Sequence, residues 1–329
     1  MPTILAFFLT LPLSILATRA VLAWLRHKRI LDHPNERSSH SQPTPRGGGL
    51  AIAPVVLASW AVLAATGVVS AAVWPVIGGA AALLALSWID DKNGLSPRLR
   101  LSVHLGVAII GILALPGDRL VFQGLLPLWA DRTAAVIGWV WFLNLYNFMD
   151  GIDGITGVET ASIGGGLVVL ALMTGGTGAP LAAVLVAAAL GFLVFNWHPA
   201  KIFLGDSGSV PLGYALGWLL LNAAADGHLA AALILPAYYL ADATITLGRR
   251  AVRGEKVWQA HRQHFYQQAL RGGRVRHDHV ALLILGENIL LIALAVLALH
   301  RPAVALAGTA VTVAVLLTTL ARLGKETAP

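Results

Sequence analysis

Two asparagines and two aspartates stand at the end of an apolar segment, in the sequence WFLNLYNFMDGIDGIT. Asn144, Asn147 and Asp150 are spaced i, i+3, i+6, which places them near one face of a helix, and Asp153 follows. A carboxylate at the centre of a bilayer costs about 2.5–3.5 kcal/mol, so such residues sit at a boundary or line a polar cavity. Side chains this rich in oxygen suit Mg²⁺ and the phosphates it carries. The alternative is a helix C-terminus with polar capping.

Two further acidic clusters border apolar segments. Asp90 and Asp91 follow one such segment, in SWIDDKNGLSPRLRL. Adjacent carboxylates raise each other's proton affinity unless a cation compensates, as a metal–diphosphate ligand would; the alternative is a solvated loop end. Asp206 lies in the small-residue turn HPAKIFLGDSGS, where the N-terminus of the next helix would favour an anion. Asp206 could hold a cation that bridges to this anion, or act only as the helix N-cap.

A basic segment over 26–47 is rich in proline and glycine, and it reads RHKRILDHPNERSSHSQPTPRG. Its candidate anion contacts are Arg37, His40 and Arg46. An ordinary basic loop beside a membrane explains the same residues equally well.

The longest basic segment spans 249–278 and contains eight Lys and Arg. His261 and His264 lie in it at helical i, i+3 spacing. Two imidazoles without a third protein ligand make a weak case for zinc. A basic helix that lies on the membrane surface is the alternative.

The composition predicts a membrane protein. The chain has 329 residues, of which 57% are hydrophobic and only 12% are charged, whereas soluble domains carry about 25% charged residues. It has no cysteine, which excludes disulfides, thiolate metal sites and cysteine nucleophiles. The net charge of +7 does not indicate nucleic acid as a partner, because the basic residues lie between apolar segments. The N-terminal segment 3–24 is too long for a signal peptide, so we interpret it as a span.

The apolar segments predict an all-α integral membrane bundle of about eleven transmembrane helices, in a single domain over 1–329. We place the spans at 3–25, 48–68, 71–89, 99–115, 133–148, 155–174, 179–197, 209–223, 229–248, 279–299 and 303–322. Asp242 and Glu287 lie within two of them, and we expect both to face the polar interior of the bundle.

The basic residues predict the orientation. With the N-terminus outside, 19 of the 23 Lys and Arg fall in or beside the cytoplasmic segments and three fall in the outer loops. The positive-inside rule therefore favours a cytoplasmic C-terminus. Every acidic, asparagine or histidine cluster described above then lies on the cytoplasmic side, so we expect the active site there. The cytoplasmic loops are 26–47, 90–98, 149–154, 198–208 and 249–278.

Together these motifs resemble the polyprenyl-phosphate N-acetylhexosamine-1-phosphate transferases, a family of integral membrane enzymes. The resemblance runs from Asp32 to Gly273, and it rests on five motifs in matching order. They are DHPNERSSHSQPTPRGGG, DDKNGLSPRLRL, NLYNFMDGIDGI, PAKIFLGDSGS and HRQHFYQ. The last differs from the consecutive histidines of the muramoyl-pentapeptide branch and is closer to the branch that initiates O-antigen synthesis, including members that use UDP-N-acetyl-fucosamine or UDP-N-acetyl-quinovosamine.

The resemblance implies a Mg²⁺-dependent enzyme of EC 2.7.8 type, with Mn²⁺ as a substitute. A UDP-N-acetylhexosamine would give its sugar 1-phosphate to undecaprenyl phosphate with release of UMP, which initiates a cell-surface polysaccharide such as an O-antigen. The implied metal ligands are Asp206 and Asp91. The implied catalytic residues are Asp90, Asp91, Asp150 and Asp153. The implied substrate-binding residues are Asn144, Asn147, His261, His264, Arg37, His40, Arg46 and Lys201. Phosphoryl transfer depends mostly on positioning and charge neutralisation; direct attack and an aspartyl-phosphate intermediate are both compatible with these residues.

Two other classes of function compete with the enzyme. A secondary transporter would bury its ionisable groups near the midplane between repeats, whereas this chain gathers them at one face and has no repeat. A lipid-binding scaffold built on 249–278 would leave the aspartates unexplained. The expected location is the bacterial inner membrane, in contact with membrane lipid, and a homodimer is compatible with the sequence.

Overall fold

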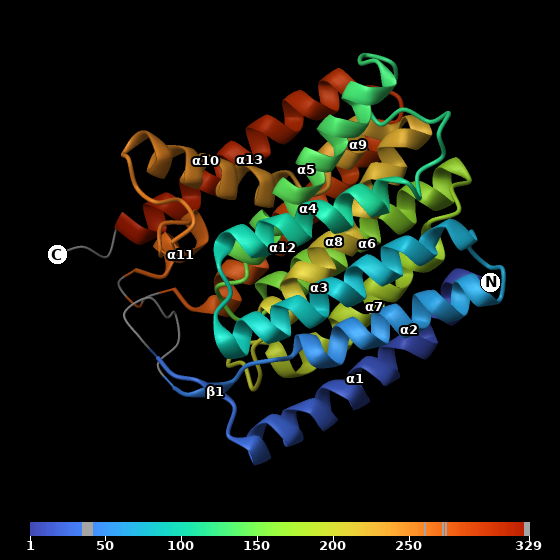
Figure 1. Ribbon diagram of the computed structural model, residues 1–329. Helices are drawn as coiled ribbons and strands as arrows, with labels where there is room; N and C mark the ends of the chain where they lie inside the picture. Colours follow the sequence, from blue (N-terminus) through green and yellow to red (C-terminus); the bar gives the residue numbers. More distant parts are fainter. Residues whose placement is uncertain (35–41, 260, 272, 274, 326–329) are drawn as a thin grey trace.

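The structure is a computed structural model that describes residues 1–34, 42–259, 261–271, 273 and 275–325. It is a bundle of long helices with almost no strand (Figure 1). The helices are α1 (Pro2–Lys28), α2 (Gly49–Ala65), η1 (Ala71–Val73), α3 (Trp74–Asn93), α4 (Pro97–Ile112), α5 (Leu128–Phe148), α6 (Ile155–Thr174), α7 (Ala179–Asn196), α8 (Asp206–Ala223), η2 (Ala224–His228), α9 (Leu229–Ile234), α10 (Ala237–Val252), α11 (Phe265–Ala269), α12 (His277–Leu297) and α13 (Pro302–Lys325).

Helix α8 forms the centre of the bundle, and its residues 207–220 are all buried. Small residues allow its neighbours to approach closely. At Gly217, for example, a Cβ atom would lie 2.5 Å from the Trp139 ring of α5. Trp139 also stacks on Tyr214 of α8 at 4.4 Å between ring centroids, and its Nε1 donates to the Tyr214 carbonyl at 2.9 Å. This packing holds the middle of α8 against α5.

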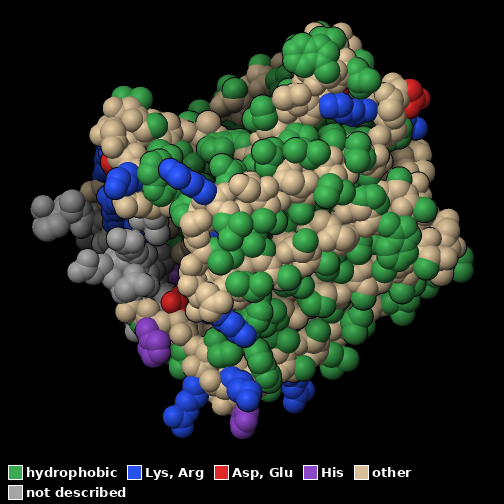
Figure 2. Space-filling view, viewed as in Figure 1, with side chains coloured by type: hydrophobic (Ala, Val, Ile, Leu, Met, Phe, Trp, Pro, Cys, Tyr) green, Lys and Arg blue, Asp and Glu red, His purple; other side chains and the backbone are tan. Residues whose placement is uncertain are grey.

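Seven helical stretches of the described residues are long and apolar enough to cross a membrane, and α2 is apolar but shorter. Figure 2 shows hydrophobic side chains over the middle of the visible face, with Lys and Arg mostly toward its ends. The prediction of a multi-pass membrane protein is confirmed, whereas the number of eleven spans stays a prediction. The seven are Pro2–Lys28, Ala71–Asn93, Ile155–Thr174, Ala179–Asn196, Asp206–Ile234, His277–Leu297 and Pro302–Lys325.

The prediction of one span over 229–248 is wrong. The chain instead continues from α8 through η2 into α9, turns at Leu235 and Pro236, and starts the separate helix α10. Pro236 has no N–H to donate within a continuous helix, so the break falls there. One buried face of α10 carries Asp242, Thr246 and Arg250, which is the pattern of an amphipathic helix rather than of an apolar span.

The connections that carry the polar motifs meet at one end of the bundle, opposite to the start of α1 (Figure 1). A short antiparallel sheet of β1 (Leu31–Asp32) and β2 (Thr44–Pro45) lies at this end, directly after α1. The turns after α3, α5, α7 and α10 join it there. The sequence prediction that the polar clusters share one side of the protein is therefore consistent with the arrangement of the helices.

Candidate active site

The segment after β2 pairs with the turn that precedes α8. Phe203 N donates to Pro45 O at 2.8 Å, and the Phe203 carbonyl accepts from Gly48 N at 2.8 Å. The two backbones come so close at Gly49 that a Cβ atom there would lie 2.1 Å from Gly208 N. Only glycine fits at such a contact. The pairing brings Arg46 beside the first residue of α8.

The Arg46 guanidinium lies between two carboxylates. Its Nη2 is 2.9 Å from Asp206 Oδ1 and 3.2 Å from Asp91 Oδ1. Arg100 Nη1 is 2.8 Å from Asp90 Oδ2 and 3.9 Å from Asp206 Oδ2. Two cations therefore pair with three carboxylates from α3 and α8. Asp91 and Asp206 each turn one oxygen toward the same positively charged group.

These two carboxylates have the chemistry of a magnesium site. Mg²⁺ is usually bound by one or two protein carboxylates, and its remaining positions are filled by phosphate oxygens and water. Because the Asp91 and Asp206 oxygens already converge on one cationic nitrogen, the two side chains share a position for a cation. The donor set fits Mg²⁺, and these two residues are its candidate ligands.

The turn between α5 and α6 lies beside this cluster. Asn147 Oδ1 accepts from Ser209 Oγ at 2.6 Å, which ties the end of α5 to the start of α8. Asp150 Oδ1 accepts from Thr156 Oγ1 at 2.6 Å. Burial raises the pKa of the Asp150 carboxyl to about 6, and the Thr156 hydrogen bond opposes that rise. Asp150 is therefore ionised only in part near pH 6.

Asp153 joins three segments. Its Oδ2 lies 2.6 Å from His198 Nδ1 and 3.3 Å from His277 Nδ1, and it accepts from Ala200 N at 3.2 Å. Burial alone would raise the pKa of Asp153, but the His277 and His198 rings beside its carboxylate hold that pKa below its usual value. The ligand atoms lie within 4.8 Å of one another, yet 2.6 Å is too short for two ligands of one ion. We interpret the cluster as a structural contact that joins the three segments.

The segment of residues 255–259 and 261–267, here called the histidine segment, covers the same turn. At Gly151 a Cβ atom would lie 2.2 Å from the Tyr266 hydroxyl, and that hydroxyl donates to the Phe148 carbonyl at 3.3 Å. The rings of His261 and His264 are 4.8 Å apart. Burial lowers the pKa of His261 to about 4, with a smaller contribution from His264, so His261 is neutral at pH 7. It can accept one hydrogen bond and donate another, but it is not a cation.

Helix α10 also fixes the first half of the histidine segment. Arg250 is buried, and its Nε donates to Glu255 Oε2 at 2.7 Å. Its two terminal nitrogens donate to the carbonyls of Lys256 at 3.1 Å and Gln259 at 3.2 Å. A planar guanidinium with five N–H groups is well suited to hold such a turn. The arrangement places Trp258 at the rim of the cavity described next.

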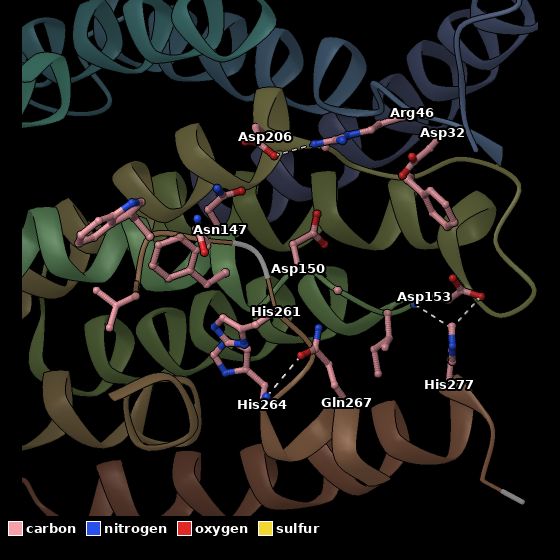
Figure 3. A pocket seen from close by; sticks show the side chains of 18 of the residues that line it. Asp32, Arg46, Asn147, Asp150, Asp153, Asp206, His261, His264, Gln267 and His277 are labelled. Atoms are coloured by element: carbon pink, nitrogen blue, oxygen red, sulfur yellow. Dashed lines mark hydrogen bonds and ion pairs between the residues drawn. The ribbon is translucent and has the colours of Figure 1, made fainter. Parts of the chain in front are cut away.

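These segments enclose a cavity of about 510 Å³, which is within the size range of small-molecule sites. Figure 3 shows Arg46 and Asp206 on one side, His261 and His264 on the opposite side, and Asp150 between them. The lining residues are Asp32, Arg46, Arg100, Asn147, Phe148, Asp150, Gly151, Ile152, Asp153, Phe203, Gly205, Asp206, Val257, Trp258, Gln259, His261, His264, Gln267 and His277.

Comparison with known proteins identifies the family. The family model described as glycosyl transferase family 4 matches residues 73–224. A probable undecaprenyl-phosphate N-acetylglucosaminyl 1-phosphate transferase of Bacillus subtilis is 30% identical over 258 residues, which are 74% of this chain and 70% of the relative. The chain belongs to the polyprenyl-phosphate N-acetylhexosamine-1-phosphate transferase family. It is therefore a membrane-bound transferase, which favours the enzyme over the transporter and scaffold alternatives.

Two other relatives of this transferase carry different names. A decaprenyl-phosphate N-acetylglucosaminephosphotransferase of Mycolicibacterium smegmatis is 29% identical over 78% of this chain and 73% of its own length. A phospho-N-acetylmuramoyl-pentapeptide-transferase of Picosynechococcus is 33% identical over 63% of this chain and 59% of its own length. The similarity therefore supports cell-wall or envelope biogenesis in general and leaves the sugar open.

The structure brings most of the predicted site residues of the transferase together. Seven of them line the cavity, and Asp90 and Asp91 stand behind it, paired with arginines. The seven are Arg46, Asn147, Asp150, Asp153, Asp206, His261 and His264. Arg37 and His40 lie outside the described residues.

Two predicted residues are not at the cavity. Asn144 turns its amide back to its own helix, where Nδ2 donates to Val140 O at 2.7 Å, so it does not line the site. Lys201 is exposed and is not among the lining residues. An i, i+3, i+6 spacing covers a broad arc of a helix, so its first member can face away from its last.

Several lining residues were not identified from the sequence, among them Arg100, Trp258 and His277. Arg100 and His277 could have been found as charged or titratable groups beside the start of a helix on the same side as the motifs. Trp258 has no sequence signal that separates it from other exposed aromatic residues. Its position follows from the turn that Arg250 holds.

The raised pKa of Asp150 predicts a pH dependence. If the ionised carboxylate is required, kcat/KM of the transferase should fall as the pH drops through about 6. Thr156→Val removes a hydrogen bond that stabilises the ionised form, so the acid limb should move to higher pH. The loss of a hydrogen bond worth about 1 kcal/mol corresponds to a rise of about 0.7 unit in the pKa of Asp150. The measurement is kcat/KM against pH for both proteins.

The control is Thr160→Val, which removes a hydrogen bond to Tyr146 one turn further along α6. It should leave the acid limb in place. An acid limb that stays at the same pH in Thr156→Val would show that Asp150 does not set it.

Proposed function

We propose that the protein transfers an N-acetylhexosamine 1-phosphate from a UDP-sugar to undecaprenyl phosphate. The products are UMP and undecaprenyl-diphosphate-sugar, which would initiate a cell-surface polysaccharide such as an O-antigen. One observation carries the proposal: Asp91 and Asp206 converge on a single cation position beside a cavity of about 510 Å³ that also holds arginines. This combination suits a diphosphate that binds together with a metal ion.

In the proposed reaction, an oxygen of the lipid phosphate attacks the β-phosphorus of the UDP-sugar. The bond between that phosphorus and the bridging oxygen breaks, and the oxygen leaves with UMP. No general base is required, because the second pKa of a phosphate monoester is near 6 and the lipid phosphate is mostly dianionic at pH 7. We therefore favour direct attack over an aspartyl-phosphate intermediate.

The residues of the chain would act mainly by positioning and by charge. Arg46 and Arg100 would attract the phosphates, since guanidinium groups bind phosphate oxygens with paired N–H bonds. Mg²⁺, when bound to Asp206 and Asp91, would neutralise charge on the diphosphate oxygens, and Mn²⁺ could replace it. Asn147, Asp150 and the contacts of Asp153 would hold the turn that borders the nucleotide.

We further propose that the site end of the bundle faces the cytoplasm of a bacterial inner membrane, with the N-terminus outside. The excess of Lys and Arg in the loops at that end supports this orientation. The natural absence of cysteine allows a clean test. A single Lys256→Cys, at an exposed position of the 249–278 segment, should react with a membrane-impermeant maleimide only after the cells are opened.

The matched control is Arg301→Cys, at an exposed position between α12 and α13 at the other end of the bundle. It should react in intact cells. Labelling of Lys256→Cys in intact cells, with protection of Arg301→Cys, would show that the orientation is the reverse of the one proposed.

A transfer assay tests the function itself. Purified protein would be mixed with undecaprenyl phosphate, Mg²⁺ and one member of a panel of UDP-N-acetylhexosamines, and UMP release would be followed. We expect release with at least one donor, and only when both the lipid and Mg²⁺ are present. If folded protein releases UMP with no donor of the panel, this function is contradicted.

A further inference from the structure

A buried carboxylate of α10 organises the second half of the histidine segment. Asp242 is completely buried, and five donors from α10, from His264 and from the first two residues of α11 surround it. Two are backbone N–H groups and two are hydroxyls, so the carboxylate accepts on every side, as an ionised aspartate does. The five are His264 Nδ1 at 3.1 Å, Phe265 N at 3.0 Å, Tyr266 N at 3.3 Å, Tyr238 Oη at 3.2 Å and Thr246 Oγ1 at 3.2 Å.

This contact determines which atom of the His264 ring can meet a substrate. A carboxylate that accepts from Nδ1 requires the proton on Nδ1, so Nε2 is the remaining atom of the imidazole that can form a hydrogen bond. Nε2 is buried and has no hydrogen-bond partner among the described residues, although its residue lines the cavity. A buried polar atom left without a partner is costly, which points to a ligand atom as its partner.

Neighbouring rings and a backbone contact fix the orientation of the imidazole. The Tyr266 ring is stacked on it at 5.7 Å with an interplanar angle of 16°, and the His261 ring lies on it at 4.8 Å. His264 N donates to Gln267 Oε1 at 3.3 Å, which fixes the backbone at the start of α11. Figure 3 shows His261, His264 and Gln267 together on the side of the cavity opposite to Arg46.

We propose that Asp242 is a positioning residue of the transferase, which fixes the tautomer and the orientation of His264 so that Nε2 contacts the bound substrate. The proposal rests on the proposed function, because it assumes that the cavity binds the substrates of the transfer. Asp242 itself touches no substrate. Its carboxylate acts through the imidazole. The hydrogen bonds that it accepts from Phe265 N and Tyr266 N hold the Asp242 and His264 side chains in a fixed relative position.

Asp242→Asn should reverse the tautomer. The carboxamide has nearly the same shape, but its NH₂ group must face atoms that were donors to the carboxylate. His264 can relieve one such conflict if Nδ1 loses its proton and accepts from the carboxamide, which leaves the proton on Nε2. In the serine protease triad, the corresponding change from aspartate to asparagine lowers kcat by about 10⁴ through the wrong tautomer. We expect a loss of about 10² to 10⁴ in kcat here.

The first experiment is a double-mutant cycle on the transfer reaction with Asp242→Asn, His264→Ala and the double variant. If Asp242 acts only through His264, the double variant should be no slower than the slower single variant within about threefold. Tyr238→Phe is the matched control, since it removes one bond to the same carboxylate and leaves the imidazole in place. It should retain activity within about tenfold of the unmodified protein. Losses that multiply in the double variant would overturn the proposal.

The second experiment does not depend on activity. In ¹⁵N spectra of the full-length protein labelled at histidine, with His264→Ala to assign the signal, His264 should carry its proton on Nδ1. A proton on Nε2 alone would overturn the proposal. If Nδ1 is protonated but no UDP-sugar is turned over, the proposed function fails and the hydrogen-bonding assignment stands.

Discussion

Asp206→Asn is expected to lower the transfer rate by at least about 10³-fold while the protein still folds and inserts into the membrane. The substitution keeps the shape of the side chain but removes a charge that both Arg46 and the proposed Mg²⁺ require. Removing one electrostatic group from a preorganised site commonly lowers the rate by about 10²–10³-fold. The loss on removing a metal ligand should lie at or above the upper end of this range. The measurement is kcat at saturating Mg²⁺, together with the binding of Mn²⁺ followed by electron paramagnetic resonance.

The matched control is Asp226→Asn. Asp226 also lies in the helical stretch that begins with α8, but at its far end, where it pairs with Arg119 away from the cavity. This variant should keep activity within about threefold, because an exposed ion pair contributes at most about 1 kcal/mol. If Asp206→Asn turns over at a near-normal rate, Asp206 is not a metal ligand.

Arg46→Gln should have two opposite effects. The guanidinium occupies the position on which the Asp91 and Asp206 oxygens converge, so its charge competes with a metal cation. Without it we expect Mn²⁺ to bind about tenfold more tightly, a modest effect because the Arg46 side chain is 40% exposed and its charge is screened. Turnover should nevertheless fall by about 10²-fold, since the diphosphate loses a cationic partner.

Arg98→Gln provides the comparison, because Arg98 is exposed and lies two residues before Arg100 at the start of α4. Neither Mn²⁺ affinity nor turnover should change in that variant. Weaker Mn²⁺ binding in Arg46→Gln would show that Arg46 supports the metal site rather than competing for it.

The sequence predicts the membrane class and most of the site, because the bilayer restricts where charged residues can lie. A charged residue in an apolar segment must face a cavity or a boundary, so Asp90, Asp150 and Asp206 could be located without a structure. Their motifs also lie on one side when the apolar segments are counted. The structure confirms that these three aspartates gather at one end of the bundle, although only Asp150 and Asp206 line the cavity itself.

The remaining features depend on tertiary packing, which residue spacing does not reveal. The role of Asp242 follows from a turn that lies 22 residues further along the chain, and no local pattern predicts that contact. The break at Pro236 was missed because the apolar residues on both sides of it are continuous in the sequence. Asn144 was placed at the site by its spacing and by the family resemblance, whereas its amide has a nearer acceptor in its own helix.

The most direct test of the proposed reaction identifies both products from a single donor. Transfer of a sugar 1-phosphate releases UMP and gives a lipid with two phosphates, whereas transfer of the sugar alone would release UDP and give a lipid with one. Nucleotide analysis and the mass of the lipid product distinguish the two outcomes in one reaction. We predict UMP and undecaprenyl-diphosphate-sugar in equal amounts; UDP with a lipid monophosphate sugar would contradict the proposed function.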